Sequence, residues 1–304
     1  MKVLITGASG FIGRALARAF AASHEVTAAV HERSFTAAGL ATARLDLTDP
    51  ASVRATVAAA RPDLVIHSAA MADPDVCERD PERARRVNVE GTAALARAAA
   101  EAGARLFHIS TDLVFDGAAP PYREEDAPKP LSLYGRTKAE AEAAALGHPS
   151  ALVLRVALVY GANPGGRPTF TDFLHGALSA GKRPRLFADQ FRTPTFVEDV
   201  GDALLRLALT PPEGPTRRGV LHLCGPERLS RLGFARLFCA AFGFDEALLE
   251  PISMSDLPSA APRPADCSLD GARLRGLLGW KPRPAAEAFA VMRDDARIRY
   301  NQVR

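Results

Sequence analysis

The feature that most constrains this chain is a glycine-rich turn near its N-terminus, Thr6-Gly7-Ala8-Ser9-Gly10-Phe11-Ile12-Gly13. A buried strand is predicted directly before it, at residues 3–6, and an amphipathic helix follows at residues 13–22. Glycines let a ligand approach the backbone, and the free N–H groups at a helix start attract an anion. The glycine spacing alone could arise by chance in a chain with 23 glycines. Its position between a strand and a helix instead predicts a phosphate-binding turn.

The first half of the chain alternates short apolar strands with helices. Strands are predicted at residues 3–6, 25–30, 64–67, 106–110 and 151–160, and helices at 13–22, 51–60, 82–103 and 134–145. Strands separated by helices of this length indicate a parallel sheet with helices on both faces. We therefore expect an α/β fold with a Rossmann-type doubly wound parallel sheet, whose ligands bind at the carboxyl ends of the strands.

The alternation breaks after Gly161. A loop is predicted at residues 163–168, a helix at 170–180, a strand that returns to the sheet at 220–224, and a mostly helical segment at 226–304 with a loop around 258–264. We expect residues 1–160 plus about 194–225 to form the dinucleotide-binding Rossmann domain. Residues 161–193 and 226–304 are expected to form a smaller, mostly helical substrate-binding region.

Composition excludes several classes of function. The net charge is only +3 and no block of like charge occurs, which argues against nucleic acid or a membrane surface as a partner. The four cysteines and seven histidines show no metal-ligand spacing, so no metal site is expected. No apolar run is long enough to span a bilayer, and no signal segment is visible. We expect a cytoplasmic protein, for which a homodimer is one option.

A tyrosine and a lysine stand one helical turn apart in Tyr134-Gly135-Arg136-Thr137-Lys138. An ammonium near a phenol lowers the tyrosine pKa from its ordinary value of about 10, which favours acid–base work. The lysine is notable because the chain has only five among its 38 Lys and Arg residues. Thr111 follows the strand at residues 106–110, where its hydroxyl could hold a substrate carbonyl. The alternatives are a surface helix with one aromatic anchor and a hydroxyl that caps a turn.

The end of the second predicted strand bears on cofactor choice. An acidic residue there would bind the adenosine ribose of NAD, whereas an arginine favours the 2′-phosphate of NADP. The chain has Val30 where the acid is expected and Arg33 close behind it, which favours NADP(H). Glu32 keeps NAD(H) possible.

Together these motifs resemble the extended short-chain dehydrogenase/reductase family over essentially the whole chain. Four segments closely resemble dTDP-4-dehydrorhamnose reductases: residues 110–117, 134–138, 189–195 and 263–270. The resemblance implies a catalytic triad of Thr111, Tyr134 and Lys138. It also implies hydride transfer from NADPH to the C4 ketone of a nucleotide sugar, with Tyr134 as proton donor and the cofactor carrying the redox chemistry.

The resemblance also implies a set of cofactor contacts. Those for the phosphates are Gly7, Gly10, Phe11, Ile12 and Gly13. Those beside the adenine are Asp46 and Leu47, and those near the middle of the cofactor are Ala69, Ala70 and Met71. Tyr134 and Lys138 would lie at the nicotinamide end, where Lys138 reaches the ribose.

Some residues depart from the family pattern or stay ambiguous. The turn Gly10-Phe11-Ile12-Gly13 has the wider-family form, and Leu158 stands where these reductases often carry an aromatic residue. Asp112 is a weaker substrate-side candidate. Arg192 could contact the substrate diphosphate or form a loop salt bridge. His67 and His108, at strand ends, are predicted to be packing residues.

Rival functions on the same scaffold remain open. A sugar-nucleotide 4,6-dehydratase needs a second carboxylate after Asp112, where this chain has Leu113. An NAD-dependent 4-epimerase would keep its cofactor bound and consume no NADPH. A non-catalytic, NADP-binding regulatory subunit, like the related beta subunit of methionine adenosyltransferase, would use the same fold to bind a partner.

Overall fold

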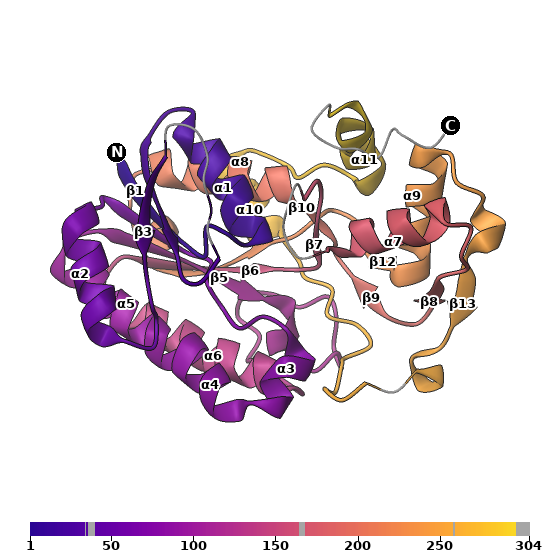
Figure 1. Ribbon diagram of the computed structural model, residues 1–304, viewed down its shortest axis with the longest axis horizontal. Helices are drawn as coiled ribbons and strands as arrows, with labels where there is room; N and C mark the ends of the chain where they lie inside the picture. Colours follow the sequence, from indigo (N-terminus) through magenta and orange to yellow (C-terminus); the bar gives the residue numbers. More distant parts are fainter. Residues whose placement is uncertain (34, 36–39, 164–167, 258, 296–304) are drawn as a thin grey trace.

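A seven-stranded parallel sheet lies at the centre of the computed structural model, which describes residues 1–33, 35, 40–163, 168–257 and 259–295 (Figure 1). Its strand order is β11-β6-β5-β4-β1-β2-β3. The strands are β1 (Lys2–Thr6), β2 (Glu25–Val30), β3 (Ala41–Arg44), β4 (Leu64–His67), β5 (Arg105–Thr111), β6 (Ala151–Val156) and β11 (Gly219–Leu223). Successive strands are added outwards from β1 on one side and from β4 on the other, so the order of strand addition reverses between β1 and β4. This topology confirms the doubly wound Rossmann-type fold, and the reversal is where such sheets bind ligands.

Helices cover both faces of the sheet (Figure 1). One face carries α1 (Phe11–Ala21), α8 (Val197–Leu209) and α10 (Ala272–Leu278), and the other carries α2 (Pro50–Ala60), α5 (Gly91–Glu101) and α6 (Leu133–Leu146). The strands between them are buried on both sides, which is why β4 and β6 are nearly continuous apolar runs. Separate apolar clusters fill the two layers, one around Leu16 and Phe20, the other around Val57 and Leu95.

A third apolar cluster lies beside the sheet, at the right of Figure 1. It is formed by α7 (Phe170–Ser179), α9 (Arg231–Phe242) and α11 (Ala285–Asp294). Aromatic rings fill it; the Phe234 ring meets Tyr160 and Phe289 edge to face at 4.9 and 5.1 Å. Three strand pairs complete this part: β7 (Val159–Tyr160) with β10 (Thr195–Phe196), β9 (Phe191–Arg192) with β12 (Leu229–Ser230), and β8 (Arg185–Phe187) with β13 (Glu250–Ile252).

Several predicted elements differ from the structure. The helix expected at 82–103 is α4 (Pro81–Arg85), a π-helical turn at Arg86–Glu90, and α5. The strand expected at 151–160 breaks between β6 and β7, where Leu158 has a φ of +21°. Residues 226–304 contain strands β12 and β13 as well as helices. Parts of three predictions lie outside the described residues: residues 164–167 of the first loop, residue 258 of the second loop, and residues 296–304 of the helical segment.

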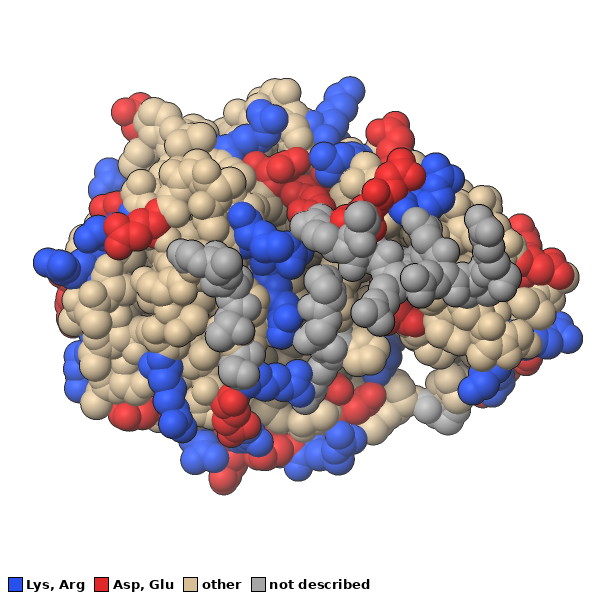
Figure 2. Space-filling view, turned by 45° about the horizontal axis from the view of Figure 1, so that its top comes forward, with Lys and Arg blue, Asp and Glu red and all other residues tan. Residues whose placement is uncertain are grey.

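Surface charge follows the balanced composition. Figure 2 shows Lys and Arg side chains gathered in the middle of one face, with acidic and basic side chains intermixed around them. Within the described ranges, no helix combines the length and apolar character needed to cross a bilayer.

Candidate functional site

The glycine turn between β1 and α1 is tightly closed. The N–H of Gly10 donates to the carbonyl of Gly7 at 2.8 Å, and Gly7 has a φ of +68°. A Cβ at Gly7 would stand 2.7 Å from the Cα of Ala69, and a Cβ at Gly13 would overlap the Gly7 carbonyl. These approaches demand glycine. Helix α1 begins with no side-chain cap and no acidic residue in its first turn, so its amino end can receive an anion.

The other predicted phosphate contacts lie in the same turn. Gly10 is exposed at the cap of α1, and Phe11 and Ile12 are half-buried in its first helical turn. Ile12 packs against the apolar cluster on that face of the sheet. The structure thus groups Gly7, Gly10 and Gly13 with these two residues at the start of α1.

The segments that follow β2 and β3 lie side by side. Arg33 is exposed just beyond β2, and His31 Nε2 stands 3.6 Å from Asp46 Oδ2. The N–H and hydroxyl of Thr48 donate to Asp46 at 2.8 and 2.7 Å, and these bonds, aided by His31, hold the Asp46 pKa below its ordinary value. Leu47 is buried next to them. The predicted adenosine-side residues therefore share one edge of the molecule.

The loop after β4 holds Ala69, Ala70 and Met71, all half-buried. The Met71 N–H donates to Asn88 Oδ1 at 2.8 Å, and Asn88 Nδ2 donates to the Met71 carbonyl at 3.1 Å and to Thr137 Oγ1 at 3.0 Å. Asn88 is buried and stands in the π-helical turn. It ties the cofactor-side loop to α6, and no sequence signal had singled it out.

Helix α6 brings Tyr134 to the carboxyl end of β5. Ser132 caps the helix by accepting from the Gly135 N–H at 3.1 Å. A Cβ at Gly135 would overlap the carbonyl of Leu113, so this glycine lets α6 lie directly against the segment after β5. As a result Tyr134 is buried within hydrogen-bonding reach of Thr111.

The electrostatics at Tyr134 differ from the sequence prediction. Burial, together with the negative charge of Asp112, raises the Tyr134 pKa, and the hydrogen bond with Thr111 only partly opposes this. The predicted lowering of the Tyr134 pKa by the Lys138 ammonium is therefore wrong. The phenol keeps its proton at neutral pH, as a proton donor requires. The Thr111 hydroxyl directs its one hydrogen to Asp112 Oδ1 at 3.0 Å.

Lys138 is buried one turn further along α6. Its ammonium donates to His108 Nε2 at 3.0 Å and to the Ile109 carbonyl at 2.8 Å. Burial lowers the Lys138 pKa to about 8, and the charge of Glu142 partly opposes this. Two of the three ammonium hydrogens are therefore engaged on the β5 side.

Asp112 lies in a cluster of charges. Arg192 Nε stands 3.0 Å from Asp112 Oδ2, and both side chains are buried. The structure thus gives Arg192 the salt bridge that was its alternative role. Arg231 donates to Gln190 Oε1 at 3.0 Å. Burial and the charges of Arg192 and Arg263 together lower the Arg231 pKa to about 9, against the opposing charge of Asp112. Positive charge therefore exceeds negative charge here.

A cavity of about 440 Å³ opens beside this cluster. Its wall combines α3 (Pro74–Arg79) with the segments around β8 and β13: Asp75, Arg79, Phe187, Gln190, Met254, Leu257, Ser259, Ala260 and Arg263. Asp75 accepts from the Ala261 N–H at 2.9 Å and from Arg263 at 2.8 Å, which joins α3 to the C-terminal part. The size and mixed polarity suit a small-molecule ligand.

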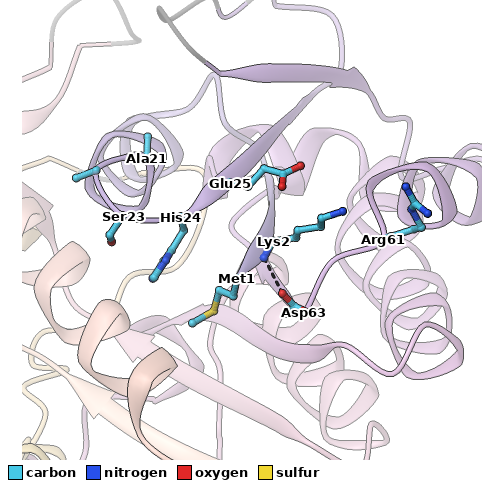
Figure 3. A pocket seen from close by; sticks show the side chains of 9 residues that line it. Met1, Lys2, Ala21, Ser23, His24, Glu25, Arg61 and Asp63 are labelled. Atoms are coloured by element: carbon cyan, nitrogen blue, oxygen red, sulfur yellow. Dashed lines mark hydrogen bonds between the residues drawn. The ribbon is translucent and has the colours of Figure 1, made fainter.

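A second hollow, of about 700 Å³, lies at the opposite end of the sheet (Figure 3). Met1, Lys2 and His24 line it, and the Lys2 N–H donates to Asp63 Oδ2 at 2.7 Å. It faces the amino ends of the strands, whereas parallel sheets of this type bind ligands at the carboxyl ends. It is therefore separate from the candidate site.

Comparison with known proteins places these features in a family. A family model described as "RmlD substrate binding domain" matches residues 1–298. The chain is 35% identical over 282 residues to methionine adenosyltransferase 2 subunit beta of Xenopus laevis, covering 90% of this chain and 81% of the relative. It is 36% identical over 277 residues to dTDP-4-dehydrorhamnose reductase of Mycolicibacterium smegmatis, covering 90% and 79%.

Solved structures agree on the fold. A hypothetical dTDP-4-dehydrorhamnose reductase from Sulfolobus tokodaii superposes with a TM-score of 0.80 at 32% identity, over 91% of this chain and 95% of that chain. A dTDP-4-dehydrorhamnose reductase from Bacillus anthracis, solved with NADP, gives 0.83 at 24% identity, over 95% and 97%. Other structures of this fold hold NAD.

Proposed function

Because this chain belongs to the RmlD substrate-binding family, a group related to NAD(P)-dependent sugar-nucleotide reductases, we propose that it reduces the C4 ketone of a nucleotide sugar with NADPH. The observation that carries the proposal is the convergence of Thr111 and Tyr134, with Lys138 one turn away, at the carboxyl end of β5. A protonated phenol and a hydroxyl at that place suit a carbonyl that gains a proton.

Each residue has a defined role in this proposal. The hydroxyl of Thr111 holds the ketone oxygen, which requires it to turn from Asp112 toward the substrate. Tyr134 then donates its proton to that oxygen. The positive charge of Lys138 stabilises the phenolate that is left, since an ammonium favours a nearby anion. NADPH, when bound, supplies the hydride.

The cofactor would lie over the reversal point of the sheet. The turn from Gly7 to Gly13 suits its phosphates, Asp46 and Leu47 would lie beside the adenine, and Ala69, Ala70 and Met71 beside its middle. The exposed Arg33 suits a 2′-phosphate, which is why we assign NADP(H) as preferred. Glu32 would be the residue to bind NAD(H).

The substrate would enter from the region of residues 161–193 and 226–304. The 440 Å³ cavity is large enough for part of a nucleotide sugar, and Arg79 and Arg263 on its wall suit a diphosphate. Asp112, whose charge acts on Tyr134, and its ion-pair partner Arg192 would line the proposed path from this cavity to Tyr134 and hold the sugar side by hydrogen bonds.

Two measurements on the purified chain test the proposal. Fluorescence titration with NADPH and NADH should show saturable binding, with NADPH bound more tightly. The loss of NADPH absorbance should then depend on added 4-keto nucleotide sugar. Tight NAD binding without net loss of NADPH, together with interconversion of sugar epimers, would favour the epimerase instead.

A second candidate function is a regulatory subunit that binds NADP without turnover. Seven of the curated relatives are beta subunits of methionine adenosyltransferase 2, at 33–35% identity. This candidate predicts saturable NADPH binding with no consumption for any 4-keto nucleotide sugar. Co-elution with a methionine adenosyltransferase catalytic subunit would support it.

A further inference from the structure

The contact between Lys138 and His108 is unexplained by the proposed reaction. His108 is wholly buried on β5, and Lys138 is 2% exposed on α6. An ammonium has three donors and no acceptor, so His108 Nε2 must accept the 3.0 Å hydrogen bond. The imidazole is therefore neutral and carries its proton on Nδ1. That nitrogen is buried and has no hydrogen-bond partner within the described part of the chain.

The surroundings keep His108 neutral. Burial lowers the His108 pKa well below its ordinary value, and the positive charge of Lys138 also acts to lower it. The His67 ring stands 5.1 Å away on β4. The His67 ring is itself held by hydrogen bonds. The Thr92 hydroxyl donates to the Asn88 carbonyl at 2.6 Å, so the Thr92 oxygen accepts a hydrogen bond from His67 Nε2 at 2.9 Å.

The other ring nitrogen of His67, Nδ1, accepts a hydrogen bond from the Thr6 hydroxyl at 2.7 Å. Thr6 is the residue directly before the glycine turn. The two imidazoles thus lie between β1 and Lys138 as a rigid, uncharged support. His108 offers Lys138 an acceptor without offering it a proton exchange partner.

We propose that His108 is a positioning residue for Lys138: its neutral imidazole holds the ammonium by accepting a hydrogen bond, so that the third N–H points into the site beside Tyr134. The proposal rests on the proposed function only for the use of that third N–H. The titratable groups that act on Lys138 are His108 on β5, His67 on β4 and Glu142 on α6.

The sign of the effect follows from the hydrogen bond. A bond accepted from the ammonium stabilises the charged form of Lys138 and so raises its pKa. Burial acts in the opposite direction and lowers the Lys138 pKa to about 8. In the proposal, the hydrogen bond to His108 offsets part of the burial cost. Loss of the acceptor should lower the Lys138 pKa further.

The test compares two substitutions of nearly equal size, His108→Gln and His108→Met. The glutamine side chain carries an amide oxygen that can accept in place of Nε2, whereas the methionine thioether is a weak acceptor. The full chain is labelled at the ε carbon of lysine, which gives only five resonances to follow by NMR across pH. Lys138→Arg assigns the resonance of interest.

In the wild type and in H108Q, the Lys138 titration should have its midpoint near the same pH. In H108M the midpoint should move down by about one pH unit. His148→Met is the control, since His148 is also buried but lies ten residues beyond Lys138, near the end of the same helix. It should leave the Lys138 midpoint unchanged.

An unchanged midpoint in H108M would overturn the proposal, as would a shift of equal size in H108Q. If H108M fails to fold, His108→Leu, which also lacks an acceptor, replaces it and should show the same downward shift of the midpoint. The titration needs neither cofactor nor substrate. A chain that consumes no NADPH but shows these midpoints would refute the proposed reaction and leave the role of His108 standing.

Discussion

The buried ion pair between Arg155 and Glu142 yields the most quantitative prediction. Arg155 on β6 places Nη2 2.8 Å from Glu142 Oε2 and Nε 3.0 Å from Oε1. Their side chains are only 3% and 5% exposed. Glu142 also accepts from Ser110 Oγ at 2.5 Å. The pair therefore joins α6, which carries Tyr134, to two neighbouring strands of the sheet.

Arg155→Met should remove the guanidinium and leave a buried carboxylate without its cation. Breaking a buried pair in this way costs about 3–5 kcal/mol of unfolding free energy. The lost contact of the guanidinium with the Phe115 ring, 4.9 Å from its centroid, adds about 0.5–1 kcal/mol. The matched control is Arg236→Met. Arg236 lies 2.8 Å from Glu246, but both side chains are more than half exposed, so the cost should stay below about 1 kcal/mol.

Urea unfolding measures both variants. The signals are circular dichroism and the fluorescence of Trp280, which packs against the core cluster beside α1. Free energies of unfolding are compared only if the slopes with denaturant agree. A cost for R155M within about 1 kcal/mol of that for R236M would refute the reasoning that burial makes this pair essential. Arg155→Met combined with Glu142→Met should cost less than the sum of the two single changes.

Three further predictions concern the site. Gly135→Ala places a Cβ against the Leu113 carbonyl and should displace the start of α6 by up to about 1 Å. Steady-state kinetics should show kcat lowered about 100-fold, and fluorescence titration should show little change in NADPH affinity. Because the ammonium of Lys138 is required and its pKa is about 8, kcat/KM should fall as pH rises through about 8. Arg33→Ser should reduce the preference for NADPH over NADH about tenfold, read from the ratio of kcat/KM for the two cofactors.

The sheet was predictable because its strands are buried on both faces and read as apolar runs. The strand at Leu64–His67 and the turn from Gly7 to Gly13 were both placed by local pattern alone. Helix α3 (Pro74–Arg79) and strand β3 (Ala41–Arg44) were missed. Helix α3 has six residues, too few for a helical period, and β3 is an exposed edge strand with no apolar alternation.

Only those residues of the site that belong to local sequence motifs could be predicted. Spacing identified Tyr134 and Lys138, but the partner of Lys138 is His108, 30 residues earlier in the chain. The pair of Asp112 and Arg192 joins residues 80 positions apart. Such contacts depend on how α6 and β9 meet β5, which the folded chain alone reveals. The predicted direction of the Tyr134 pKa shift was also wrong, because burial and the charge of Asp112 raise this pKa and only the hydrogen bond with Thr111 opposes them.

The central claim is that Tyr134 donates a proton to a substrate ketone, and Tyr134→Phe tests it most directly. Tyr160→Phe is the control, because Tyr160 is also buried and its hydroxyl has no hydrogen-bond partner among the residues described. Both variants should bind NADPH like the wild type. With a 4-keto nucleotide sugar, Y160F should consume NADPH normally and Y134F should lose at least about 100-fold in kcat. Full turnover by Y134F would contradict the account.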